Sequence, residues 1–546
     1  MKNRLVRALA ALVFLCAAAG AHAAFPSPDP TGLWFDPAQP GWGVQVARQG
    51  DTLFVAVFTY DANHTPTWFV APQVTQIANE IDPIPPFPVF GGTLYRTSGP
   101  AFSAATFDPH AVTATPVGNL FLHYDLPNNP GRLVVGYNVD NANVLKTVQP
   151  QTWSVSARDL IGSYGGGLFV TGPSRCPSVP LPLPIPPQPM TFSVAAGNPA
   201  DNAHIVWGSG VDVACTIDAT YTRQGQLATL QGSPACGPVG NTAAPTGTLT
   251  ISAITSNAAG FFGSARLEMP QAQAEACVYE GSFGGTLAQS AERSGLQPDP
   301  TGIWFDPAES GWGLAITQQG GTSVAVLFVY GTDGKPAWYV ASNVIDTGHG
   351  VNTLVQEAFA GTLYRTTGPY YGSDTDTTVL GATAAGTLQV AFIGGTDKLD
   401  VAYTVAGTAV HKTVQRETWG SNAALLHDSF TGGLFPSTGT ACGSTGLFAT
   451  TPVTLITTTD PSSGSIRFSW GTGTDTACVL DTTYTQTGQL ASLAGPLKCG
   501  PIGNPTATLG TVTIFGASVA EKGFAGFAGF SSGGCATGGF VGGVRH

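Results

Sequence analysis

Most of this chain is written twice, and the duplication limits the folds that it can adopt. The string DPTGLWFDPAQPGWG at residues 29–43 returns as DPTGIWFDPAESGWG at residues 299–313, with 12 of 15 positions identical. A repeat this long is far beyond the unit of a solenoid or a propeller. The sequence therefore predicts a tandem duplication of a pair of domains.

Both copies keep every tryptophan, and every cysteine beyond the first 23 residues. No histidine has a histidine counterpart, so the commonest catalytic side chain is not shared by the two halves. The conserved pairs are Trp34/Trp304, Trp42/Trp312, Trp68/Trp338, Trp153/Trp419, Trp207/Trp470, Cys176/Cys442, Cys215/Cys478, Cys236/Cys499 and Cys277/Cys535.

Within each copy, the residues expected to stabilise the fold change from tryptophans to cysteines part-way along the sequence. The first part holds four Trp and no Cys, and the second holds one Trp and four Cys. This change predicts two subdomains in each half. We expect Trp-rich subdomains at 24–155 and 298–421, cysteine-rich subdomains at 156–288 and 422–546, and a polar linker at 289–297.

The first 23 residues have the layout of a secretory signal. Three basic residues precede an apolar stretch at 8–19, and Ala21-His22-Ala23 forms a small-x-small cleavage site. The stretch is shorter than the roughly 20 residues of a membrane-spanning helix. We therefore expect a secreted or periplasmic protein, cleaved near Ala23, with no transmembrane segment in the mature chain.

The composition is acidic and poor in charge. Without the three basic residues of the signal, 18 Lys and Arg oppose 33 Asp and Glu. Nucleic-acid-binding proteins need a basic surface, so no nucleic-acid partner is expected. The chain has 71 Gly and 41 Pro and is rich in Thr, Val and Phe, which favours strands joined by tight turns.

The Trp-rich subdomains show a rhythm of short strands. LFVAVFTY at 53–60 and SVAVLFVY at 323–330 are each followed by a turn and a second strand, and one turn contains Asp333-Gly334, a hairpin pair. About eight antiparallel strands and no helix are predicted, in a barrel or a sandwich, because both limit exposed edges. Further strands of the first copy are expected at 42–48, 67–71, 92–97, 118–125, 132–139 and 144–153.

The cysteine-rich subdomains are predicted to be β as well. ACTIDATYTRQGQLATL at 214–230 matches ACVLDTTYTQTGQLASL at 477–493 at 11 of 17 positions, with Gly225 and Gly488 where a hairpin turn belongs. Such a turn brings nearby cysteines together, and the remaining ones would tie the ends of each subdomain. The predicted disulfides, typical of an exported chain, are Cys215–Cys236, Cys478–Cys499, Cys176–Cys277 and Cys442–Cys535.

The motif Gly-x-Trp-Phe-Asp-Pro-x-x-x-Gly-Trp-Gly contains candidate ligand contacts. Trp42 and Trp312 have glycine on both sides, and glycine cannot cover an indole ring. They would offer an open face to a flat ligand such as a sugar, or else pack across a barrel end. Strand residues would complete each predicted site: Tyr60 and Trp68 in the first half, and Tyr330 and Trp338 in the second.

Arg96 and Arg365 recur in the sequence Gly-Thr-Leu-Tyr-Arg-Thr. An ion pair with Asp36 and Asp306, or with Asp29 and Asp299, is the structural interpretation. Recognition of an anion by the planar guanidinium is the functional one. Both arginines are therefore candidate ligand contacts.

Catalytic motifs are missing from the sequence. It has no Gly-x-Ser-x-Gly elbow, His-Glu-x-x-His pair, phosphate-cradling loop or Cys-x-x-Cys pair. The shared carboxylates could form a glycosidase pair, but Asp36 precedes a proline in a turn and Asp218, paired with Asp481, belongs to another subdomain. We expect no catalytic residue, no cofactor and no metal ion.

Gly32-Leu33-Trp34 and Gly302-Ile303-Trp304 resemble the opening of lipocalin and avidin-type barrels, in which this Trp closes one end and the other end holds a small ligand. Lipocalins also have a C-terminal helix and a late Arg over the Trp, whereas here no helix is visible and Arg96 and Arg365 lie mid-domain. The fuller motif is similar to modules of exported bacterial proteins of unassigned function. That resemblance implies export and no activity.

Together these patterns predict an exported, non-enzymatic binding protein with two similar aromatic-lined sites. A glycan, including a cell-surface polymer, or a small apolar molecule suits concave aromatic surfaces with few charges. Two tethered sites would gain avidity on a polymer. The alternatives are a structural or adhesive cell-surface protein without a small ligand, and a secreted hydrolase.

Overall fold

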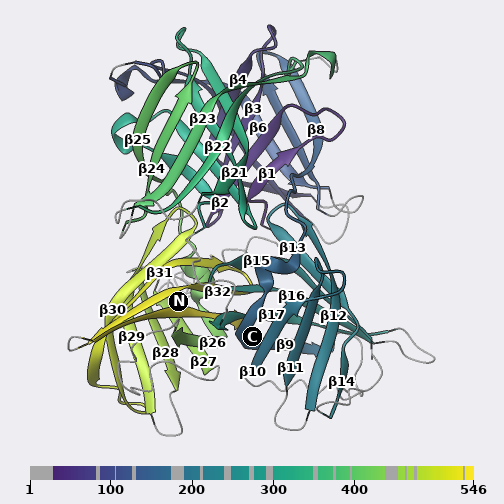
Figure 1. Cartoon of the computed structure of the whole chain (residues 1–546), viewed down its shortest axis with the longest axis vertical. Coiled ribbons are helices and arrows are strands. Elements are labelled where there is room, and N and C mark those ends of the chain that lie inside the picture. Colours follow the sequence, from purple (N-terminus) through teal and green to yellow (C-terminus); the bar gives the residue numbers. More distant parts are fainter. Residues whose placement is uncertain are drawn as a thin grey trace, which may run out of the picture.

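The computed structural model shows a chain of antiparallel strands arranged as four barrels (Figure 1). No α-helix occurs in the described residues, and none of their helical turns could span a membrane. The predicted all-β class and tandem duplication are confirmed, and closed strand pairing selects barrels over sandwiches. The residues described are 29–80, 87–104, 106–125, 131–173, 190–208, 213–238, 247–269, 276–289, 299–347, 355–372, 377–393, 396–436, 453–460, 464–471, 476–532 and 535–546. The predicted signal and the linker beyond Gln289 lie outside them.

Barrels A1 and A2 are formed by the Trp-rich parts of the two halves, and each closes with eight strands in sequence order. Barrel A1 consists of β1 (Gly32–Phe35), β2 (Gly43–Gln49), β3 (Thr52–Tyr60), β4 (Pro66–Glu80), β5 (Phe87–Ser98), β6 (Thr113–Tyr124), β7 (Leu133–Val139) and β8 (Ala142–Pro150). Barrel A2 consists of β18 (Gly302–Phe305), β19 (Gly313–Gln319), β20 (Thr322–Tyr330), β21 (Pro336–Asp346), β22 (Val355–Thr367), β23 (Gly381–Ile393), β24 (Lys398–Val405) and β25 (Thr408–Arg416).

Barrels B1 and B2 are formed by the cysteine-rich parts. B1 closes through pairing of β11 with β12, and its β13 and β14 take the place of the single strand β30 in B2. B1 consists of β9 (Gly162–Pro173), β10 (Met190–Ala196), β11 (Ala203–Gly208), β12 (Val213–Gln224), β13 (Leu227–Gly232), β14 (Ala235–Pro238), β15 (Thr248–Asn257), β16 (Gly260–Met269) and β17 (Cys277–Gln289). B2 consists of β26 (Asp428–Pro436), β27 (Val453–Asp460), β28 (Ser465–Gly471), β29 (Thr476–Thr487), β30 (Leu490–Pro501), β31 (Ala507–Ala520), β32 (Gly523–Ser532) and β33 (Cys535–Arg545).

The disulfides fasten strands that are already neighbours. As predicted, Cys215 bonds Cys236 across β12 and β14, and Cys478 bonds Cys499 across β29 and β30; Gly225 and Gly488 lie in the turns that follow β12 and β29. Both glycines have φ near +60°, where a side chain would be strained. Cys277 and Cys535 are also disulfide-bonded, but their predicted partners Cys176 and Cys442 lie outside the described residues.

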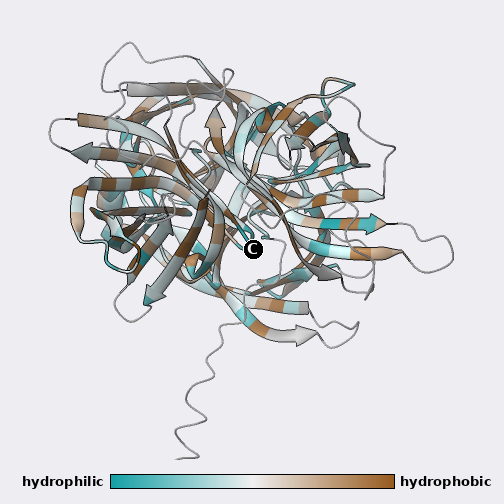
Figure 2. Ribbon diagram, turned by 90° about the horizontal axis from the view of Figure 1, so that it is seen from below, coloured by the Kyte–Doolittle hydropathy of each residue, from teal (hydrophilic) through white to brown (hydrophobic). Residues whose placement is uncertain are grey.

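The barrels pack in two pairs, with A1 beside A2 and B1 beside B2 (Figure 1). Viewed from the B side, hydrophilic and hydrophobic residues alternate along many strands, as expected where one face of a strand points inward (Figure 2). The B1–B2 contact is made by Phe169 and Phe262 against Ala525 and Val544. Glycine allows the close approach, because a Cβ on Gly523 would lie 3.0 Å from the Phe262 ring.

Candidate functional site

Trp42 and Trp312 lie in the cores of barrels A1 and A2, where they are 8% and 6% exposed. The glycines beside them make room for side chains of the other half. A Cβ on Gly41 would lie 2.4 Å from Leu380, and one on Gly311 would lie 2.6 Å from Val112. Flanking glycine thus permits covering by a distant segment, and the structural alternative, packing of these rings, is the arrangement found.

The other predicted aromatic contacts lie between barrels A1 and A2. Trp338 packs against Phe58 with ring centroids 5.1 Å apart, and Trp68 packs against Phe328 at 5.6 Å. The Tyr60 hydroxyl donates to the Gly41 carbonyl oxygen at 2.5 Å, and burial raises the pKa of Tyr60 to about 12. Tyr330 is equally buried and donates to Gly311. These rings, which we call the A1–A2 interface (Phe58, Tyr60, Trp68, Phe328, Tyr330 and Trp338), join the halves.

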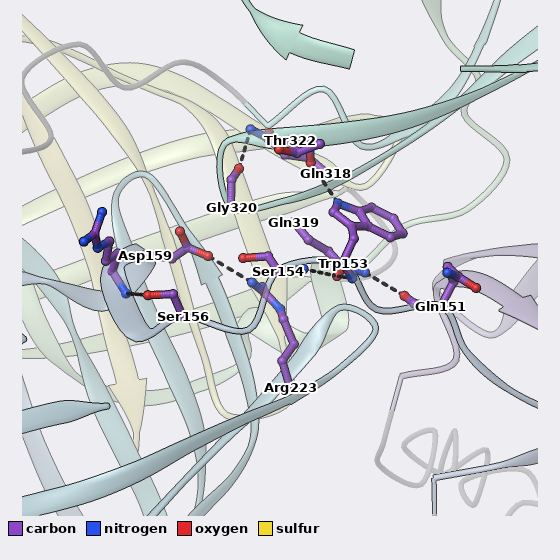
Figure 3. Close-up of polar contacts among 11 residues, drawn as sticks. Gln151, Trp153, Ser154, Ser156, Asp159, Arg223, Gln318, Gln319, Gly320 and Thr322 are labelled. Atoms are coloured by element: carbon purple, nitrogen blue, oxygen red, sulfur yellow. Dashed lines mark hydrogen bonds and ion pairs between the residues drawn. The ribbon is translucent and has the colours of Figure 1, made fainter. Parts of the chain in front are cut away.

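A second reciprocal contact follows the last strand of each A barrel. The Trp153 indole donates to the Thr322 carbonyl oxygen at 3.1 Å, and its backbone N–H donates to the Gln319 side chain at 3.0 Å (Figure 3). Gln319 in turn donates to the Gln151 carbonyl oxygen at 2.9 Å. Trp419 of the second half makes the matching contacts with the first half: its indole donates to the Thr52 carbonyl oxygen and its backbone N–H to the Gln49 side chain. Sequence reasoning missed both glutamines, although they are an identical pair.

Each half also covers the other half's A barrel with a loop. Phe102 packs against Tyr339 of A2, and its backbone N–H donates to the Tyr330 carbonyl oxygen at 3.0 Å. Tyr371 packs against Phe69 of A1 with ring centroids 5.4 Å apart, and its backbone N–H donates to Tyr60. The described parts of these loops therefore pack on the A barrel of the other half.

The predicted ion pairs of the two arginines are wrong. Arg96 pairs with Asp140, whose pKa is lowered by the hydrogen bond from Arg96. Asp36 instead accepts from the Ala38 backbone N–H at 2.9 Å, because an Asp before proline readily caps its own turn. Arg365 has no ion pair with any residue that the structure describes.

The shared carboxylates are likewise engaged separately. Asp306 caps its turn as Asp36 does, Asp299 accepts from the Thr301 backbone N–H, Asp218 contacts His204 at 2.7 Å, and Asp481 pairs with Arg467 at 2.6 Å. Within the described ranges no three His, Cys, Asp or Glu side chains converge as metal ligands would.

No known protein-family model matches the chain, and no curated protein matches it.

A cavity of about 360 Å³ lies where barrel A1 meets barrel B1. Its lining combines hydroxyl and amide side chains with the apolar residues Leu33, Leu227 and Ala253, Asp29 is the one charged residue in that lining, and two aromatic rings contribute. One wall comes from the start of β1 and the ends of β6 and β8, and the other from the β12–β13 hairpin with β15 and β16. We call it the A1–B1 cleft, lined by Asp29, Thr31, Gly32, Trp34, Tyr124 and Pro150 of A1 and by Thr222, Gln224, Gln226, Thr229, Ser252 and Ser264 of B1.

Two polar groups give the cleft a preference for hydrogen-bond donors. Asp29 is exposed; burial raises the pKa of Tyr124, the charge of Asp29 adds to this, and Arg48 opposes it. The Gln226 side-chain oxygen is buried and accepts no hydrogen bond from any described residue. A buried acceptor without a partner carries a desolvation cost of about 1–3 kcal/mol, which a donor group of a ligand would relieve.

The equivalent place in the second half is filled by Arg416. This residue pairs with Trp304 across β25 and β18, as Pro150 pairs with Trp34 across β8 and β1. The Arg416 guanidinium lies 4.3 Å from the centre of the Trp304 ring and donates to the carbonyl oxygens of Asp299 and Thr301. A late arginine thus lies over this Trp in the second half, in addition to the mid-domain Arg365 that both copies share.

Arg416 is 3% exposed, and burial lowers its pKa to about 10 against the opposing effects of Asp299 and Asp397. Its position could have been suspected from the sequence, because Arg416 stands where the first copy has a proline.

Proposed function

We propose that the protein is an exported, non-enzymatic binding protein whose ligand site is the A1–B1 cleft. The observation that carries the proposal is the volume of about 360 Å³ at the junction of two barrels. Small-molecule sites have volumes of roughly 300–1,000 Å³ and favour domain junctions. Hydroxyl and amide groups around Trp34 suit a small polar ligand, including a sugar.

The second half contributes scaffold to this function. Arg416 occupies the place that would be the second cleft, and the paired aromatic rings lie between barrels A1 and A2. One ligand per chain is the expected stoichiometry.

Binding can be tested with a single substitution that gives the first half the arginine of the second half. Pro150→Arg places a side chain where Arg416 lies in its own half, and we expect it to close the cleft. Pro501→Arg, at the exposed end of β30, adds the same charge elsewhere and is the matched control. Ligands are screened by thermal shift and measured by calorimetry. The proposal requires a ligand that binds the native protein and Pro501→Arg, and binds Pro150→Arg at least about tenfold more weakly.

A structural or adhesive protein is the second candidate. It is favoured by the A1–A2 interface, which places the shared aromatic residues in contacts that hold the halves together. A screen of neutral sugars, amino acids, amines and carboxylates in which no compound shifts the melting temperature would support this alternative.

A further inference from the structure

We propose that the A1–B1 cleft binds a guanidinium group, as in arginine or a related small molecule; this inference rests on the cleft being a ligand site. The chain itself contains the precedent, because the second half holds a guanidinium at the equivalent place. The first half keeps counterparts of the residues that surround this guanidinium, but it has Pro150 in place of Arg416.

The residues that contact Arg416 in the second half have counterparts in the lining of the A1–B1 cleft. Asp299 and Thr301, whose carbonyl oxygens accept from Arg416, have Asp29 and Thr31 as counterparts, and both line the cleft. Trp304, which lies under the guanidinium, has Trp34 as its counterpart. Both indoles are held in the same orientation, since each donates to the carbonyl oxygen of the proline four residues earlier at 2.8 Å.

The glycines show which half is open. A Cβ on Gly302 would lie 2.8 Å from an Arg416 guanidinium nitrogen. The nearest atom to a Cβ on Gly32 is the Gln226 Cγ at 3.5 Å, so no described guanidinium lies within 4 Å of that position. The space taken by the guanidinium in one half is therefore open in the other.

The chemistry favours a planar cation. A guanidinium can stack on an indole and donate in its own plane to two carbonyl oxygens, whereas an ammonium cannot do both. The Asp29 carboxylate adds attraction at the cleft. Two differences weaken the site. Asp397, which favours the charged form of Arg416, has Gly131 as its counterpart. The neutral Gln318 has the cation Arg48 as its counterpart, and Arg48 lies near Asp29. We therefore expect binding weaker than that of a site with two acids.

The experiment compares methylguanidinium and free arginine with methylurea, a neutral planar molecule of the same shape, and with glucose. Calorimetry is carried out on the full chain and on three variants. We expect one methylguanidinium per native chain, none in Pro150→Arg, and two in Arg416→Ala, where the second cleft is opened. Methylurea should bind at least about tenfold more weakly, because it lacks the charge for the indole face and Asp29.

Asp29→Asn keeps an oxygen that can accept from Thr31 and removes only the charge, so it tests the site without opening or filling it. It should weaken methylguanidinium binding and leave any binding of glucose unchanged. Circular dichroism establishes that each variant is folded.

The outcomes separate this inference from the proposed function. If glucose or methylurea binds the cleft at least as tightly as methylguanidinium, the guanidinium inference fails and the cleft remains a ligand site. If nothing tested binds, the guanidinium inference fails and the wider screen decides the proposed function; if a ligand binds Pro150→Arg as it binds the native protein, both fail. If Arg416→Ala is folded and gains no second site, the precedent drawn from the second half is overturned.

Discussion

The indole N–H of Trp338 in barrel A2 donates to the backbone carbonyl oxygen of Thr59 in barrel A1 at 3.0 Å. Its counterpart Trp68 reaches back to Val329 at 3.4 Å. Trp68 and Trp338 thus make contacts between the copies, which explains their presence in both without a ligand.

Trp338→Ala should destabilise the protein by about 3–5 kcal/mol, the usual cost of removing a buried large aromatic side chain. Trp338→Phe keeps a ring against Phe58 and should cost clearly less. Chemical denaturation monitored by circular dichroism measures both. Equal losses in the two variants would contradict the packing role of the ring.

Iodide should quench the tryptophan fluorescence of the native protein only weakly. Eight of the ten Trp side chains are 8% exposed or less, and only Trp153 and Trp419 are half-buried. The quenchable fraction should therefore disappear in a Trp153→Phe/Trp419→Phe double variant. Strong quenching that persists in that variant would show that indoles of the cores are accessible.

Glu417→Gln should stabilise the protein at pH 7. Burial raises the pKa of Glu417, so the native state binds its proton more tightly than the unfolded chain does. Its stabilising effect is present below the ordinary carboxyl pKa and is lost as the pH rises through the raised value. Glutamine removes this cost, and the first half has Gln151 at the equivalent position.

The melting temperature of Glu417→Gln should exceed that of the native protein at pH 7, and the difference should shrink as the pH falls toward 4. Asp333→Asn, which removes a charge from an exposed turn, is the control. A difference that does not depend on pH would refute the assignment to Glu417.

Replacing both Cys478 and Cys499 with alanine should lower the free energy of unfolding by about 2–4 kcal/mol, because the crosslink restricts the unfolded chain. The cysteines are 21 residues apart and face each other on β29 and β30. Denaturation curves of the double variant provide the measurement. No loss would mean that the hairpin alone restricts the unfolded state to the same degree.

The sequence was sufficient to predict the strands, the hairpins and two disulfides, because these depend on local patterns. It was insufficient for the aromatic residues, because their role depends on which face of a strand meets another barrel. In β3, Leu53, Val55 and Val57 point into A1, whereas Phe58 and Tyr60 point toward A2. The sequence did contain an indication of this, because the run at 53–60 is apolar at nearly every position, which indicates a strand buried on both faces.

The A1–B1 cleft was beyond prediction for a different reason. Its walls come from segments about 70 or more residues apart in two barrels, and no local pattern reports how the barrels meet. The exchange of Pro150 for Arg416 is visible in the two copies. Its meaning depends on the register that sets each residue beside a Trp.

The exchange of loops and indoles between the halves has a consequence for dilute solution. In a dimer of separate chains, such an interface would be lost below its dissociation constant. Here one polypeptide supplies both partners, so their effective concentration is fixed by the chain and not by the amount of protein present. Barrels A1 and A2 should therefore remain associated at any dilution at which the protein stays folded.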